Sequence, residues 1–217
     1  MEFENFCEPN HTVFGMGNKK ELTVIFLTDY HMKERWIPEL EKWVEAKNDL
    51  KIDLVLLGGD FDNLSVYSLD HDHPEYKISE ARITDFFCKL GFLSAPIYFV
   101  PGNHDPVSYF QSPKEGKTQL TVTDDSFNSH LKIYEIGENL WIAGIGGCCP
   151  AVKLDKSTKT TSNIWVGFPY ASDSDSKYDI EMLEGLIKQK IDQDPSTSIL
   201  LLTHNGPSDS GTVRFSK

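Results

Sequence analysis

Four short apolar runs in this sequence are each followed directly by polar residues of the types that bind metal ions. The runs carry no charge and are rich in Val, Ile, Leu and aromatic residues, which is typical of strands buried on both faces. The runs span residues 22–27, 54–57, 97–100 and 199–202, and the polar segments after them are Asp29-Tyr30-His31, Gly58-Gly59-Asp60, Gly102-Asn103-His104-Asp105 and Thr203-His204-Asn205. Because the carboxyl ends of parallel strands open onto one crevice in an α/β sheet, we predict that these polar side chains converge on a single site.

The segments between the first runs have the pattern of helices. Apolar residues recur there at helical spacing, which predicts helices over residues 33–48 and 78–93. A last helix is predicted over residues 178–193, before the fourth run. The resulting alternation of strands and helices favours a parallel sheet with right-handed crossovers.

The alternation of predicted strands and helices ends after the third run. Residues 132–136 and 140–145 read as two strands joined by a short turn, so we predict an antiparallel hairpin. Residues 114–126 and 157–175 are polar and are predicted to be loops. We expect substrate choice to depend on the loops at residues 62–76, 111–126 and 157–175.

Length and charge limit the class of protein. At 217 residues without a linker-like segment, the chain is predicted to form a single domain over residues 1–217, with residues 1–20 irregular and covering one edge of the sheet. The formal net charge of −12 argues against stable nucleic-acid binding, which depends largely on Lys and Arg. We find no secretory signal pattern and no run of the roughly 18 apolar residues that a membrane span needs, so we expect a cytoplasmic location.

The four polar segments, in their order, resemble the signature of the calcineurin-like metallophosphoesterase superfamily: Asp-x-His, Gly-Asp, Gly-Asn-His-Asp/Glu, a lone His after a strand, and Gly-His-x-His. The first four elements are present between residues 29 and 204, and Gly-His-x-His does not occur. The resemblance implies an α/β fold, a four-layer α-β-β-α sandwich. Because the fifth element belongs to the last strands of the second sheet in this family, we expect a C-terminally short chain with an incomplete second sheet. Its free edge is expected to be completed by further residues or covered by a partner chain.

The resemblance also implies a centre of two divalent metal ions. Asp29 and His31 would bind the first ion, and Asn103 and His204 the second. Two ions held close together need a bridging carboxylate, and Asp60, which follows a Gly-Gly turn, is predicted to supply it. These nitrogen and oxygen ligands favour ions of the Mn, Fe, Zn or Mg type.

The implied activity is hydrolysis of a phosphomonoester or a phosphodiester. A metal-bound hydroxide would be the nucleophile, and His104 would be the general acid that protonates the leaving group. Asp105 would orient His104. The sequence does not indicate which phosphoester is the substrate.

Two alternatives stay open at this point. Any one of Asp29, Asp60 and Asp105 taken alone also suits a turn or a helix cap, although their joint occurrence favours a metal site. A second function, from a different class, is that of a phosphoesterase-like scaffold or interaction subunit of a larger assembly, with weak or no catalysis. The absence of Gly-His-x-His motivates this alternative.

Other conspicuous residues are predicted to have ordinary structural roles. His71-Asp72-His73 is the one His-x-His in the sequence, and its Pro and acidic neighbours predict a solvated loop without a ligand role. His11 and His130 are predicted to be surface or partly buried histidines. Trp36 and Trp43, on one side of the first helix, are predicted to belong to the core.

Overall fold

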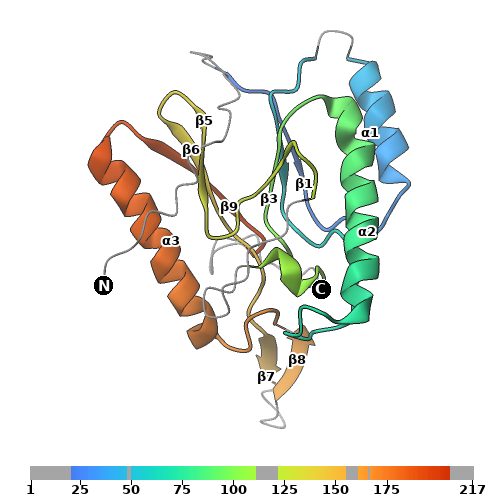
Figure 1. Ribbon diagram of the computed structural model, residues 1–217, viewed down its shortest axis with the longest axis vertical. Helices are drawn as coiled ribbons and strands as arrows, with labels where there is room; N and C mark the ends of the chain where they lie inside the picture. Colours follow the sequence, from blue (N-terminus) through green and yellow to red (C-terminus); the bar gives the residue numbers. More distant parts are fainter. Residues whose placement is uncertain (1–20, 48–49, 111–121, 155–160, 166, 206–217) are drawn as a thin grey trace.

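The computed structural model describes residues 21–47, 50–110, 122–154, 161–165 and 167–205 (Figure 1). Two sheets face each other, and helices cover the outer face of each (Figure 1). This arrangement confirms the predicted α/β fold with its four-layer α-β-β-α sandwich. The predicted irregular segment 1–20 lies outside the described residues, and the single domain over residues 1–217 stays a prediction.

The first sheet is fully parallel and has the strand order β1-β2-β3-β4. Its strands are β1 (Val24–Leu27), β2 (Leu54–Leu57), β3 (Ile97–Phe99) and β4 (Ser126–Asn128). All four residues of β2 are buried, as an uncharged run in the middle of a covered sheet requires. The first three strands confirm the prediction from the apolar runs.

The second sheet has the order β5-β6-β9, with the predicted antiparallel hairpin followed by a parallel strand. Its strands are β5 (Ile133–Gly137), β6 (Leu140–Ile145) and β9 (Ser198–Thr203). Within the described residues β9 pairs with β6 alone, and Leu201 is 52% exposed. A partner chain over this edge stays a prediction.

In the described residues three α-helices cover the sheets. The helices α1 (Trp36–Glu45) and α2 (Pro74–Lys89) lie on the first sheet, and α3 (Asp173–Gln193) lies on the second (Figure 1). Two short 3-10 helices, η1 (Leu90–Leu93) and η2 (Val107–Tyr109), follow α2 and β3. Apolar clusters fill all three interfaces between the layers, so the sandwich is a rigid support for the strand ends.

His73 has a capping role that its His-x-His context did not reveal. Its Nδ1 accepts a hydrogen bond of 3.3 Å from the Glu75 N–H at the start of α2, and Pro74 occupies the first turn. The segment His71-Asp72-His73 therefore leads into α2. That it has no ligand role stays a prediction.

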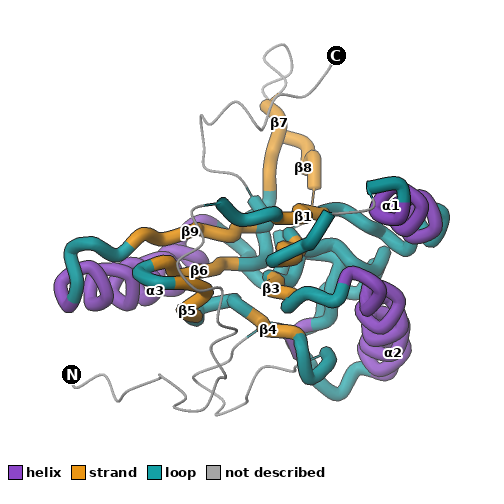
Figure 2. Tube along the Cα trace, turned by 90° about the horizontal axis from the view of Figure 1, so that it is seen from above, coloured by secondary structure: helices purple, strands orange, loops and turns teal. Residues whose placement is uncertain are grey.

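Two predicted loops contain regular structure instead. Within the predicted loop 157–175, β8 (Thr161–Trp165) pairs with β7 (Ala151–Leu154), and Figure 2 shows this hairpin projecting from the layers. In the same stretch α3 begins at Asp173, five residues before the predicted start of this helix. Its first turn is polar and acidic, which suits a helix N-terminus but shows no apolar periodicity from which a helix could be predicted. The predicted loop 114–126 runs into β4, and residues 111–121 lie outside the description.

The prediction that Trp36 and Trp43 belong to the core is wrong. They are 43% and 49% exposed and line an apolar pocket of about 250 Å³ together with Leu27 and Tyr30. The physical reason is the position of β1, which is an edge strand of the first sheet, so in the described part of the chain nothing covers that side of α1.

Candidate metal centre

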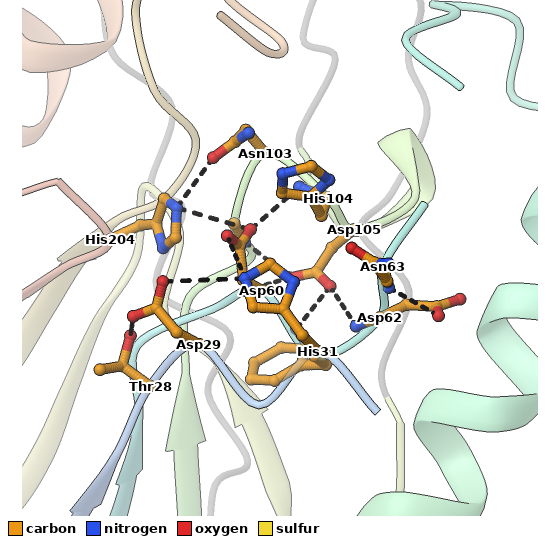
Figure 3. Close-up of polar contacts among 12 residues, drawn as sticks. Thr28, Asp29, His31, Asp60, Asp62, Asn63, Asn103, His104, Asp105 and His204 are labelled. Atoms are coloured by element: carbon orange, nitrogen blue, oxygen red, sulfur yellow. Dashed lines mark hydrogen bonds and ion pairs between the residues drawn. The ribbon is translucent and has the colours of Figure 1, made fainter. Parts of the chain in front are cut away.

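The predicted site residues come together at the carboxyl ends of four strands. Asp29 follows β1, Asp60 follows β2, Asn103 follows β3, and His204 follows β9 (Figure 3). His31 joins them from the turn after Asp29 (Figure 3). The two sheets thus contribute side chains to one place, although the residues are up to 175 positions apart in the sequence.

Asp29, His31 and Asp60 form a first group of potential ligands. One ligand atom from each lies within 4.8 Å of the others. The His31 Nε2 is 3.4 Å from Asp60 Oδ2 and 4.0 Å from Asp29 Oδ1. The Nδ1 of the same ring is buried and has no hydrogen-bond partner among the described residues. A ring held against two carboxylates in this way is suited to sharing a cation with them.

Asp60, Asn103 and His204 form a second group. His204 Nε2 lies 3.1 Å from Asn103 Oδ1 and 3.5 Å from Asp60 Oδ1. Its Nδ1 lies 2.7 Å from the carbonyl oxygen of Gly58, which can only accept, so this nitrogen carries a proton. In the neutral ring, Nε2 is then an acceptor facing two acceptor oxygens. Metal-binding histidines typically donate their other N–H to a carbonyl in the same manner.

Asp60 lies between the two groups and is 4% exposed. Its Oδ2 faces His31, and its Oδ1 faces His204 (Figure 3). Oδ1 also accepts a hydrogen bond of 3.0 Å from the backbone N–H of His104. Each carboxylate oxygen is therefore directed at a different histidine.

The backbone of three expected ligands is strained. Asp29, His31 and Asp60 have φ angles of 55°, 46° and 56°, in the left-handed region. Each such residue costs on the order of 1 to 3 kcal/mol and persists where the surroundings hold it. Here the loops hold each other, since the Asp29 N–H donates to the Gly59 carbonyl at 3.1 Å and the His31 N–H to the Asp60 carbonyl at 2.9 Å. Strain of this kind is concentrated at functional sites.

Two glycines allow the strand ends to approach this closely. Gly59 has a φ of 93°, and a Cβ added to it would meet the Gly102 nitrogen at 2.5 Å. A Cβ on Gly102 would meet Asp60 Oδ1 at 2.2 Å. The glycines of the Gly-Asp and Gly-Asn-His-Asp segments are therefore required by the packing of one segment against the other.

Asp105 holds these segments together from beneath. It is fully buried, and its carboxylate accepts hydrogen bonds of 2.7 to 3.1 Å from the backbone N–H groups of Asp60, Phe61, Asp62 and Gly102. Burial, and next the negative charge of Asp60, raise the pKa of the Asp105 carboxyl well above its usual range, while the N–H groups oppose this shift. A cation beside Asp60 would offset the repulsion between the two carboxylates.

The expected pairing of Asp105 with the His104 ring differs from the contacts observed. His104 Nδ1 lies 2.8 Å from the carbonyl oxygen of Leu64 and therefore donates a proton to it. The ring packs edge-on against that of His31, with centroids 5.2 Å apart. Leu64, which no motif singles out, is thus the residue that orients His104.

The sequence profile of the calcineurin-like phosphoesterase family matches residues 22–216 of the chain. The chain belongs to this family. Among solved structures, TT1561 of Thermus thermophilus has a TM-score of 0.50 at 15% identity, over 87% of this chain and 70% of that chain. A second solved structure has a TM-score of 0.49 at 13% identity, over 75% of this chain and 63% of that chain. No curated protein matches the sequence significantly.

Membership of the calcineurin-like phosphoesterase family indicates metal-dependent phosphoester hydrolysis as the general chemistry. The donors fit this chemistry, because carboxylate oxygens and imidazole nitrogens suit divalent ions. Among the described residues no Lys or Arg pairs with Asp29 or Asp60; their ion-pair partners are His31 and His204, and they also accept hydrogen bonds from the Thr28 hydroxyl and the His104 backbone N–H. In the described part of the chain no helix is long and apolar enough to cross a membrane.

His130 lies in the core rather than at the surface. It is 1% exposed, and its Nδ1 accepts a hydrogen bond of 3.0 Å from the Gly146 N–H. The prediction of a surface or partly buried histidine is therefore wrong for His130, because it pairs with Gly144 of β6 and its ring packs against Phe110, contacts that the local sequence does not reveal. His11 lies outside the described residues.

Burial lowers the pKa of His130 to about 3. In the unfolded chain the pKa of His130 has its ordinary value of 6.5. Between pH 6.5 and 3 the unfolded state therefore binds a proton that the folded state does not, so the stability of the fold decreases as the pH falls. We expect His130 to account for a loss of about 2 kcal/mol between pH 7 and pH 5. Urea unfolding of the wild type and His130→Asn at both pH values measures it. Equal pH dependence in the two proteins would contradict this assignment.

Proposed function

We propose that the protein hydrolyses a phosphomonoester or phosphodiester with two divalent metal ions. Asp29, His31 and Asp60 would hold one ion, and Asp60, Asn103 and His204 the other. The observation that carries the proposal is Asp60, whose two oxygens are directed at His31 and His204 separately. Ions of the Mn, Fe, Zn or Mg type suit this ligand set.

The bound ions would supply an activated water and positive charge for the phosphoryl group. The remaining tasks fall to the chain. His104 is proposed as the general acid, since its Nδ1 is fixed by Leu64 and its Nε2 is the nitrogen that can exchange a proton with the leaving oxygen. Asp105 is proposed as a positioning residue, because it ties the turn of Asp60 to the segment of Asn103 and His104.

The proposal is tested by metal content and turnover together. We expect about two ions per chain in the wild type by elemental mass spectrometry, and hydrolysis of 4-nitrophenyl phosphate or bis(4-nitrophenyl) phosphate. Asp60→Asn keeps the shape of the side chain but removes the charge that both ions would share. Its metal affinity is expected to fall by at least about 100-fold, since even indirect partners of ligands are worth 10- to 100-fold.

Asp85→Asn is the matched control, because Asp85 is an exposed carboxylate on α2 that pairs with Lys89. It should keep both metal and activity. Absence of metal in the wild type, or an unchanged metal content in Asp60→Asn, would refute the proposed centre. Wild-type protein that binds two ions but hydrolyses no phosphoester would favour the scaffold alternative.

A further inference from the structure

The wall of the candidate centre beside His104 is aromatic. The ring centroid of Tyr67 is 6.1 Å from that of His104 and 6.0 Å from that of Phe168. Phe168 is buried, whereas Tyr67 keeps 38% of its surface exposed. Tyr67 is thus supported from the protein side and presents part of its ring to solvent next to His104.

The loop that carries Tyr67 is anchored on both sides of it. Before Tyr67, the backbone N–H of Leu64 donates to the carbonyl oxygen of His104 at 3.3 Å, and the Leu64 carbonyl accepts from the His104 ring. After Tyr67, the backbone of Ser68 is hydrogen-bonded to the Tyr76 hydroxyl through both its N–H and its carbonyl. A ring held in place before a ligand arrives loses little conformational entropy on binding.

The support behind Tyr67 is equally fixed. The backbones of Phe168 and Cys148 exchange two hydrogen bonds of 2.9 Å. The pKa of the Tyr67 hydroxyl is raised, mainly by partial burial and to a smaller extent by the negative charge of Asp60. Tyr67 is therefore within electrostatic reach of the proposed metal bridge as well as beside the proposed general acid.

A general acid has to contact the oxygen of the leaving group, so the leaving group must lie on the His104 side of the phosphorus. We propose that Tyr67 is the binding platform for this group and that it selects phosphoesters whose alcohol carries a planar aromatic ring. Offset or edge-to-face contact with the exposed part of the Tyr67 ring supplies the preference. The inference rests on the proposed function, since it uses the position of His104 beside the scissile bond.

The test compares two esters with similar alcohols, one planar and one not: benzyl phosphate and cyclohexylmethyl phosphate, or their methyl diesters if the wild type prefers diesters. Phosphate release gives kcat/KM for wild type, Tyr67→Ala, Tyr67→Phe and the control Tyr178→Ala. Binding of benzylphosphonate and cyclohexylmethylphosphonate, which are not hydrolysed, is measured on the same proteins. Tyr178 is a suitable control because it is 60% exposed on α3, outside the aromatic wall.

We expect the wild type to prefer the benzyl compounds and Tyr67→Ala to lose about five- to tenfold on them, with at most a twofold change on the cyclohexyl compounds. Tyr67→Phe should keep the preference, and Tyr178→Ala should change nothing. Equal losses on both compounds, an unchanged Tyr67→Ala, or a Tyr67→Phe as impaired as Tyr67→Ala would overturn the inference and leave the proposed function standing. A wild type that hydrolyses neither ester and binds neither phosphonate would overturn the inference alone if it still binds metal and hydrolyses a 4-nitrophenyl ester, and would overturn the proposed function as well if it does neither.

Discussion

Replacing His104 by Ala is expected to lower kcat for an unactivated alkyl phosphoester by about 10²- to 10⁴-fold, the range for loss of a general acid. The loss on a 4-nitrophenyl ester should be much smaller, because that leaving group departs without needing a proton. Metal content should equal that of the wild type, since no candidate ligand is removed. Steady-state kinetics on both esters, with elemental mass spectrometry of the same samples, measures all three expectations.

The dependence on the leaving group is what separates acid catalysis from a structural effect of the substitution. His104 contacts the candidate centre in two ways: its backbone N–H donates to Asp60 Oδ1 and is retained in the Ala variant, whereas its ring, which packs against that of His31, is removed. His71→Ala is the control, since His71 lies before α2 and apart from the four strand ends. Equal losses of kcat on the activated and unactivated esters, or loss of metal, would contradict the role of His104 as general acid.

The strand ends could be predicted from the sequence because each of them is a local pattern. An uncharged apolar run followed by Asp, His or Asn is visible without knowledge of the fold. Three such runs form parallel strands of the first sheet and have their polar ends at the same edge, and the fourth, β9, brings His204 to that edge from the second sheet. For this reason the sequence sufficed to predict that Asp29, Asp60, Asn103 and His204 would meet.

The features that the sequence did not reveal depend on contacts between distant segments. The strand β4 has polar side chains inside the protein, and Asn128 is buried because its side-chain N–H donates to the Tyr109 carbonyl at 2.7 Å. The orientation of His104 is set by a backbone carbonyl at Leu64, a group that every residue has. Tyr67 lies in a loop expected to affect substrate choice, but no spacing distinguishes it from other exposed tyrosines.

Asp105→Ala is expected to lower the free energy of unfolding by about 3 to 5 kcal/mol, the range for removing one partner of a buried charged network. The reason is the number of backbone groups left without an acceptor. The N–H groups of Asp60, Phe61, Asp62 and Gly102 all point at this one carboxylate, and water cannot replace it readily at a fully buried position. Urea unfolding at pH 7 measures the loss.

The same substitution distinguishes two roles for Asp105. If Asp105 oriented the His104 ring, Asp105→Ala would lower kcat on unactivated esters and leave stability close to that of the control Asp85→Ala, whose carboxylate is exposed. If Asp105 holds the Asp60 turn against the Gly102 segment, stability and metal affinity fall together. Asp105→Asn should also be destabilised, because its amide would place N–H groups against backbone N–H groups. Stability of Asp105→Ala equal to that of Asp85→Ala would contradict the positioning role.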